Sequence, residues 1–252
     1  MEYLKRTYRT SFRQDDLVHF QVVVRQTDLD IGVRRERFSP ELVSWVKNVL
    51  QELREPLERY TQEYPAFLHS LVPYDPLSGA PPIAIELAQA ARLAGVGPMA
   101  AVAGAFAQHI GRALARRSKD VIVENGGDIY LRSTRQRRIG IFAGGSPLSN
   151  RIALEIKPEE TPLGICTSSG TVGPSLSLGR ADAAVILSPS ASLADAVATA
   201  AGNMVQNSGD VQQAAEFALA VKGITGAVII KNDRMAACGK LKLVPLVTDS
   251  QQ

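Results

Sequence analysis

Hydrophobic positions alternate with polar ones in several short stretches of the chain, a pattern typical of half-buried strands. The stretches are 17–38, 121–131, 137–145, 152–158, 164–169, 181–187, 226–232 and 234–244. In the first of them, Asp28 to Asp30 predict either a hairpin turn or the start of a short second strand. Asn232 and Asp233 predict the turn between the last two. The three stretches between 137 and 169 are expected to be successive strands of one antiparallel sheet.

Apolar residues recur at helical spacing in the other segments. Ser39 is suited to cap a helix whose first residue is Pro40, and Pro56 should kink that helix or lie near its end. Further helices are predicted over 83–94, 98–117, 191–206 and 210–221, and residues 64–82, with five prolines, are expected to be loop.

Composition sets broad limits on the protein. With 252 residues, of which 45% are hydrophobic and 21% charged, the chain is expected to fold as one globular domain over 1–252 or as two intimately packed subdomains. The net charge is +3 and the basic residues are spread out, apart from 132–138, so nucleic acid is not an expected partner. We expect no signal peptide, no membrane span and a cytoplasmic location, with Cys166 and Cys238 as buried free thiols.

A Ser/Thr/Gly-rich segment follows the stretch that ends at Cys166. Residues 167–173, with the sequence TSSGTVG, offer four hydroxyls and two glycines in seven positions. Exposed hydroxyls and backbone N–H groups with little side-chain bulk are suited to bind anions and phosphates. Ordinary turn chemistry is the alternative, but the number of hydroxyls exceeds what a turn needs, so we favour ligand binding here.

Asp195 and Thr199 lie four residues apart on the predicted helix 191–206, and hence on one face. A carboxylate beside a hydroxyl is a reasonable start for a Mg²⁺ site that also uses waters and substrate phosphates. Two structural interpretations compete with this one. Ser192 and Asp195 could form a capping box, and the Thr199 hydroxyl could bond the backbone carbonyl of Asp195.

The segment Asn125–Asp128 contains a strong signal for a tight hairpin, because Asn-Gly is a preferred turn dipeptide. A functional interpretation is equally open. Gly126 and Gly127 would let a ligand approach the backbone, with Glu124, Asn125 and Asp128 as polar contacts.

Three motifs in one order, VENGGDIYL, CTSSGTVG and SLADAVAT, resemble the ApbE family of FAD:protein FMN transferases, once described as thiamine-biosynthesis lipoproteins. The resemblance covers roughly residues 95–245. Through AGVGPMAAVAGA, VENGGDIY and TSSGTVG, the whole chain is similar to a compact, largely uncharacterised cytoplasmic branch of that family.

The resemblance implies an α+β fold, the ApbE-like T-fold, in which antiparallel sheets pack against helices. It also implies a site for FAD or a related nucleotide with Mg²⁺. It places the metal at Asp195 and Thr199. The residues expected to bind the nucleotide lie in the glycine turn and the hydroxyl-rich loop: Asn125, Gly126, Gly127, Asp128, Thr167, Ser168, Ser169, Gly170 and Thr171. A flavin transferase would also have an acceptor protein as partner, and a homo-oligomer is compatible with the Ala/Gly-rich helix.

This chain departs from the transferase pattern in three places. The His-bearing segment that ends in a DPxTG-like turn is missing, because 175–180 leads directly into the next strand. Ala103–Gly104 stands where the family tends to have Lys-Gly, and Pro174 stands where the compact branch is expected to have His. Two hypotheses therefore remain: FMN transfer or FAD pyrophosphate cleavage, or a non-catalytic accessory protein, for which the resemblance permits a role in sulfur assimilation.

Overall fold

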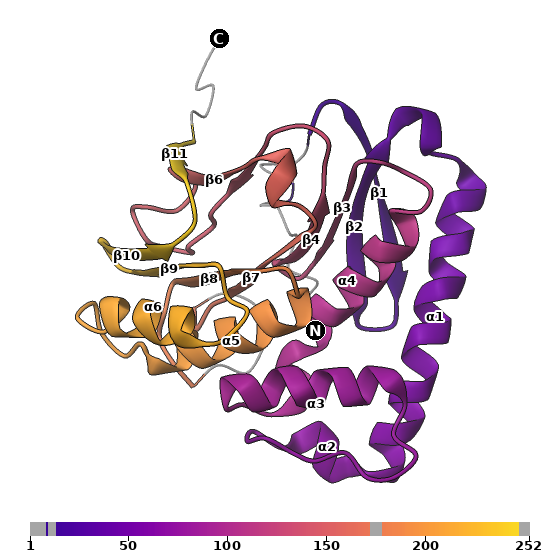
Figure 1. Cartoon of the computed structure of the whole chain (residues 1–252), viewed down its shortest axis with the longest axis horizontal. Helices are drawn as coiled ribbons and strands as arrows, with labels where there is room; N and C mark the ends of the chain where they lie inside the picture. The colour runs from indigo at the N-terminus through magenta and orange to yellow at the C-terminus, as the bar shows by residue number, and fades with distance from the viewer. Residues whose placement is uncertain (1–8, 10–13, 172–177, 247–252) are drawn as a thin grey trace.

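The computed structural model describes residues 9, 14–171 and 178–246, and these form three layers (Figure 1). The central layer is an antiparallel sheet of eight strands. Their spatial order is β1 (Leu17–Val24), β2 (Thr27–Arg34), β3 (Val121–Asn125), β4 (Asp128–Arg132), β7 (Leu163–Ser168), β8 (Ala183–Ser188), β9 (Gly226–Lys231) and β10 (Arg234–Gly239). A smaller antiparallel sheet orders its strands as β11 (Leu243–Pro245), β6 (Ile152–Ile156) and β5 (Arg137–Gly140).

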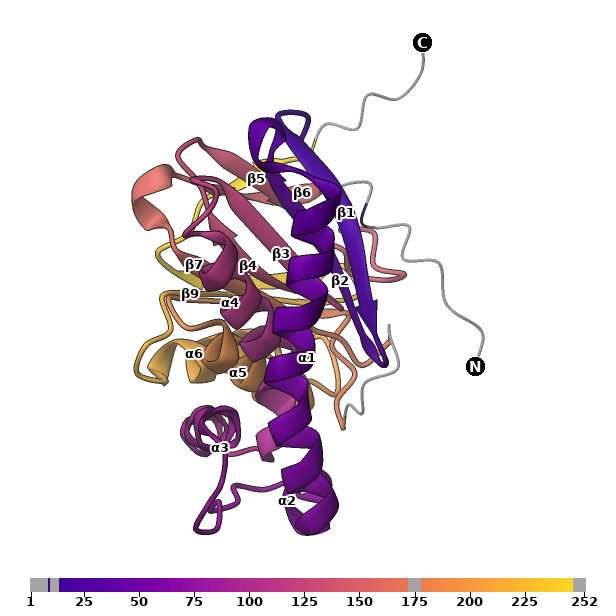
Figure 2. The ribbon, with the colours of Figure 1, turned by 90° about the vertical axis from the view of Figure 1, so that its right-hand side faces the viewer.

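One face of the large sheet is covered by helices α1 (Pro40–Glu63), α4 (Val102–Leu114), α5 (Ala191–Met204) and α6 (Val211–Ala220). Helices α2 (Pro65–His69) and α3 (Pro82–Ala94) pack mainly against these helices. Figure 1 shows α5 and α6 against the β7–β9 half of the sheet, and Figure 2 shows α1 and α4 against the β1–β4 half. The fold is therefore α+β, as the sequence predicted.

Each face of the large sheet has its own hydrophobic core, as the period of two along a strand requires. On β2, Leu29, Ile31 and Val33 pack towards the helices. On β3 and β4, Ile122 and Leu131 pack towards the smaller sheet. Polar residues that follow one another on a strand therefore belong to different layers.

Local signals placed most of the elements correctly. The Ser39 hydroxyl accepts the Leu42 N–H at 3.3 Å, and Pro40 is the first residue of α1. The helices predicted near 83–94, 191–206 and 210–221 are all present. Pro56 lies inside α1, which continues to Glu63.

Two sequence-based expectations were wrong, and for a third the structure decides between the two alternatives. The first hairpin turns at Arg25 and Gln26, with Arg25 at a φ of 54°, so the second alternative is confirmed: Asp28 and Asp30 lie in a strand, β2. Segment 137–156 leaves the large sheet, because β5 and β6 pair with each other and with β11. Part of the expected loop 64–82 is helical, as α2.

The two free cysteines differ in burial. Cys166 is buried on β7, as expected, whereas Cys238 on β10 is only half-buried.

Across the described ranges, no single helix is long and apolar enough to cross a membrane. One pair, Pro82–Ala94 and Pro98–Leu114, reaches that length and composition only together, and it is bent by 98°.

Candidate functional site

The β3–β4 hairpin places a glycine turn at the edge of the helical layer. Asn125 pairs with Asp128, and the two residues between them, Gly126 and Gly127, have φ angles of 69° and 106°. These angles favour glycine, so the tight hairpin that the sequence predicted is confirmed. A Cβ atom added at Gly126 would meet nothing within 4 Å, which leaves the outer side of the turn open.

Both polar residues before the turn are used in holding it. The Asn125 side-chain amide donates to the carbonyl of Ala103, just inside α4, at 3.0 Å. Glu124 Oε1 accepts the Gly127 N–H at 2.8 Å. The turn is therefore fixed from two sides, by the start of α4 and by its own strand.

Asp195 lies in α5 and points at the same end of α4. Its Oδ2 accepts the Gly104 N–H at 2.8 Å, and the side chain is buried. Helix α5 is capped by Ser190, whose hydroxyl accepts the Leu193 N–H at 3.3 Å, so the capping interpretation of Ser192 and Asp195 was wrong. A Cβ at Gly104 would lie 2.3 Å from the Ala191 carbonyl oxygen, so only glycine lets α4 and α5 approach this closely.

Asp128, the first residue of β4, is a second buried carboxylate next to Asp195. Burial, and then the negative charge of Asp195, raise the pKa of Asp128 well above its usual value, against hydrogen bonds from the Cys166 thiol and the Thr167 N–H. Burial likewise raises the pKa of Asp195 to about 7. Asp128 Oδ1 has no hydrogen-bond partner, although it is buried. Two carboxylates that are buried together without a cation are costly to maintain.

The hydroxyl-rich segment begins beside this acid pair and then turns away from it. The Thr167 carbonyl lies 3.5 Å from where a Gly127 Cβ would be, so β7 ends next to the glycine turn. Further along, Thr171 donates its N–H to Ser169 Oγ at 3.1 Å, and its hydroxyl lies 3.4 Å from Asp182 Oδ1. The Gly170 N–H donates to the Ala181 carbonyl at 2.9 Å.

The predicted site residues thus divide into two groups. Packing brings the glycine turn, Asp128, the end of β7 at Thr167, and Asp195 to one place. Ser169, Gly170 and Thr171 form a turn that leads towards Asp182 instead. Ser168 and Thr199 are half-buried, and Ser168 lies opposite Gly202 of α5. Val172, Gly173 and Pro174, which the sequence motifs also include, lie outside the described residues.

The donor set fits a hard divalent cation. Among the described residues, no group of three or more His, Cys, Asp or Glu side chains converges on one point. A cation at the acid pair would therefore have two carboxylates within reach, and would complete its shell with hydroxyl, backbone, water or phosphate oxygens. Mg²⁺ is typically bound in this way, and the unpartnered Asp128 oxygen is available to it.

Arg9, which the sequence analysis missed, supports the glycine turn from the opposite face of the sheet. Its guanidinium donates to Glu124 Oε2 at 2.6 Å and to Asp28 Oδ1 at 2.9 Å. Glu124 therefore joins Arg9 to the Gly127 N–H through its two oxygens. The contact spans 115 residues of sequence, and no local pattern could have indicated it.

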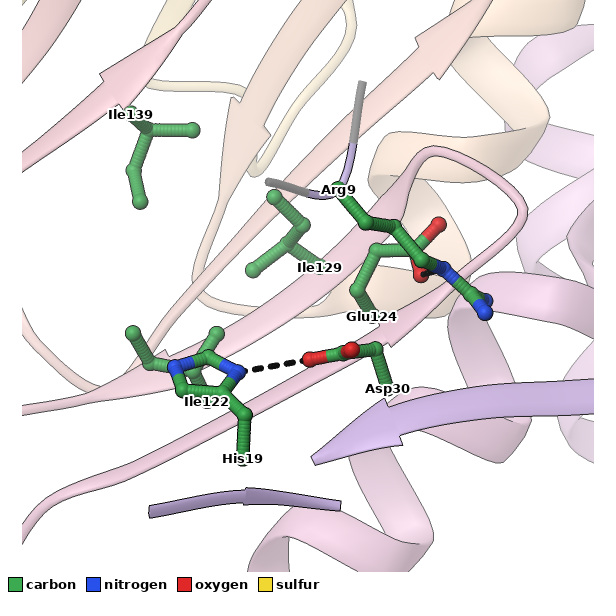
Figure 3. A pocket seen from close by; sticks show the side chains of 7 residues that line it. All are labelled: Arg9, His19, Asp30, Ile122, Glu124, Ile129 and Ile139. Carbon is green, nitrogen blue, oxygen red and sulfur yellow. Dashed lines mark hydrogen bonds and ion pairs between the residues drawn. The ribbon is translucent and has the colours of Figure 1, made fainter. Parts of the chain in front are cut away.

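Figure 3 shows a small cavity beside Arg9 and Glu124, with His19 and Asp30 on its other side. His19 Nδ1 lies 2.6 Å from Asp30 Oδ1. The cavity has a volume of about 20 Å³, enough for about one water molecule and too small for a nucleotide. Because Asp30 and Glu124 point towards the smaller sheet, this histidine is separated from the acid pair by the large sheet itself.

The other two histidines lie on helices. His109 Nε2 contacts Glu86 Oε2 at 2.6 Å, and Glu86 Oε1 accepts the Ser192 hydroxyl at 2.9 Å. His69 ends α2. His19 and His109 thus each contact a carboxylate other than Asp128 and Asp195.

Comparisons with known proteins place the chain in a family. A family model described as AbpE bacteria matches residues 9–236. A UPF0280 protein of Methanothrix thermoacetophila is 42% identical over 206 residues, covering 81% of this chain and 86% of that protein. A UPF0280 protein of Methanopyrus kandleri is 43% identical over 230 residues, covering 87% and 90%.

Solved structures share the fold at low sequence identity. The flavin transferase ApbE from Vibrio cholerae superposes with a TM-score of 0.55 at 13% identity, covering 88% of this chain and 96% of that one. The ApbE protein from Thermotoga maritima gives a TM-score of 0.51 at 12% identity, covering 85% and 94%. At such identities the likeness extends to the fold alone.

Proposed function

This chain belongs to the AbpE bacteria family, and we propose that it binds a flavin nucleotide, FAD or a related pyrophosphate, together with Mg²⁺ at the acid pair. The observation that carries the proposal is the pair of buried carboxylates, Asp128 and Asp195, one of which has an oxygen without a partner. A bound cation would relieve the repulsion between these two buried carboxylates, and its remaining positive charge would attract a pyrophosphate.

Each part of the site would have a separate role. Asp195 and Thr199, with the free oxygen of Asp128, would hold the metal, which when bound supplies positive charge against the phosphates. The open backbone at Gly126 and Gly127 and the hydroxyls of Thr167 and Ser168 would contact the nucleotide. Gly104 and Asn125 keep the end of α4 in place between the two carboxylates.

Whether binding leads to reaction distinguishes two functions. Transfer of FMN to an acceptor protein, or cleavage of the FAD pyrophosphate, is the function that the transferase resemblance supports. A non-catalytic accessory protein, with a role in sulfur assimilation as one candidate, is supported by the missing His-bearing segment and by the contacts of His19 and His109 with carboxylates other than the acid pair. Both functions require that the nucleotide binds, and only a measurement of turnover distinguishes them.

The test is a titration of the purified protein with FAD, with and without Mg²⁺, while released AMP and FMN are measured. We expect FAD to bind at least about tenfold more tightly when Mg²⁺ is present, because the cation neutralises both the acid pair and the pyrophosphate. Asp195→Asn should abolish this dependence. Asp233→Asn is the matched control, since Asp233 is an exposed carboxylate in the β9–β10 turn. Equal FAD affinity with and without Mg²⁺ would contradict the proposal, and Mg²⁺-dependent binding without product would assign the accessory function.

A further inference from the structure

A second concentration of charge lies at the far end of α4. A groove of about 310 Å³ separates the segment after β2 from the segment after α4. Its walls carry five cationic side chains and one carboxylate: Arg34, Arg37, Arg116, Arg117, Lys119 and Glu36. Gly104 and Leu114 are ten residues apart, so the groove is about 15 Å along the helix axis from the acid pair.

The cations differ in how much of their charge is already compensated. Arg34 is paired with buried Asp120 and bonds Thr134. Arg37, Arg116 and Lys119 are exposed and form no ion pair with any described residue. Glu36 lies 4.0 Å from Arg34 and is the only carboxylate that the described residues contribute to the groove wall. A large uncompensated positive charge therefore faces the hollow.

A structural role explains only part of this arrangement. Cations just after a helix favour its C-terminal dipole, which suits Arg116 and Arg117 after α4. Arg34 and Arg37, however, come from a chain segment about eighty residues earlier, where they flank and end the single-turn 3-10 helix Arg35–Arg37. Gathering like charges from two segments around one hollow is unfavourable unless an anion joins them.

We propose that this groove is a second binding site, for a small molecule that carries two or more phosphate groups. Arginine guanidinium groups match phosphate oxygens in pairs, and several cations around one volume favour a ligand with several phosphates. An extended polyanion such as RNA is a poorer match, because the chain has a net charge of only +3 and half of the other described arginines are paired with carboxylates.

The chain has a built-in probe for this site. Its single tryptophan, Trp45 on α1, lies under Arg117, with the guanidinium carbon 4.1 Å from the ring centroid. An anion that pairs with the Arg117 guanidinium changes the electrostatic environment of the Trp45 ring. Binding in the groove should therefore change tryptophan emission.

The experiment is a titration of the purified full-length protein with inorganic tripolyphosphate, followed by Trp45 emission without flavin or Mg²⁺. We expect saturable binding that weakens as salt rises and that falls roughly tenfold or more in the double variant Arg116→Gln/Lys119→Gln. Arg59→Gln is the matched control, because Arg59 is exposed on α1 outside the groove. Asp195→Asn should bind tripolyphosphate as the wild type does, which separates this site from the acid pair.

Circular dichroism of the double variant checks that it is folded. Three results would overturn the proposal: no emission change up to about 10 mM tripolyphosphate, equal affinity in the double variant and Arg59→Gln, or equal loss of affinity in Asp195→Asn. A poly-glutamate peptide that bound in the groove more tightly than tripolyphosphate would also overturn it, in favour of a protein-docking surface.

Discussion

Each face of the large sheet carries a buried acidic cluster. In the described part of the chain, basic side chains compensate the negative charge of one cluster and do not compensate that of the other. On the face towards the smaller sheet, Arg9 from the same chain forms ion pairs with Asp28 and Glu124, and His19 Nδ1 lies 2.6 Å from Asp30 Oδ1. On the face towards the helices, Asp128 and Asp195 repel each other, and no cationic side chain among the described residues offsets their charge.

The difference separates structural acids from functional ones. Carboxylates that exist for stability are accompanied by their own cations, because a buried unpaired charge is costly. Carboxylates that await a ligand remain without one, and the fold tolerates the cost. Perturbed pKa values in such a pair are typical of functional sites.

The largest expected effect is on the balanced face. Replacing Arg9 by Met removes the guanidinium from Glu124 and Asp28, and the free energy of unfolding should fall by about 3–5 kcal/mol. Urea denaturation measures this. Arg25→Met is the control, because the Arg25–Glu58 pair is largely exposed and should contribute about 1 kcal/mol or less. Similar losses in the two variants would show that Arg9 does not balance the cluster.

Metal-free protein should show an unusual pH dependence on the unbalanced face. Because the pKa of Asp195 is raised to about 7, the folded protein binds more protons than the unfolded chain. The contribution of Asp195 to the free energy of unfolding is therefore fully present below about pH 4 and is lost as the pH rises through about 7. The loss amounts to about 3–4 kcal/mol. The measurement compares urea denaturation of wild type and Asp195→Asn in EDTA across this range. Parallel curves would contradict the assignment.

Asp120 should show the opposite trend, as a carboxylate that its neighbours do balance. Burial opposes ionisation, but hydrogen bonds from the Thr134 N–H, Ser133 and Arg34 lower its pKa to about 2. Its stabilising contribution is present above about pH 4 and is lost as pH falls through about 2, on the order of 2 kcal/mol. Asp120→Asn should remove that acid-side slope in thermal melts. A slope that survives the substitution would assign it to other groups.

The smallest expected effect is a gain in stability on substitution of a buried residue. Asp128→Asn removes the repulsion within the acid pair, so in EDTA at pH 8 the variant should be more stable than wild type, by about 1 kcal/mol after the cost of burying an amide. It should also lose the rise in melting temperature that Mg²⁺ gives the wild type. Calorimetry with and without Mg²⁺ measures both. A variant less stable than wild type in EDTA would mean that Asp128 is a structural acid.

Local signals in the sequence determined most of the secondary structure. The Ser39 cap and Pro40 fix the start of α1, and the glycines after Asn125 fix the β3–β4 turn, because each depends only on neighbouring residues. The same signals failed for residues 137–156, whose strands pair with β11 near the end of the chain. Alternation of hydrophobic and polar residues predicts that a segment forms a strand, but it does not identify the strand with which that segment pairs.

The candidate site divides in the same way. The spacing of Asp195 and Thr199 on one helix, and the Gly-Gly-Asp turn, could be read from the sequence alone. Only tertiary packing decided that Asp195 would reach the Gly104 N–H and face Asp128, that Arg9 would hold Glu124, and that two arginine-bearing segments would border one groove. These contacts join residues about eighty or more positions apart, or lie between a helix and a sheet. Their formation depends on how whole layers pack rather than on any preference of the residues themselves.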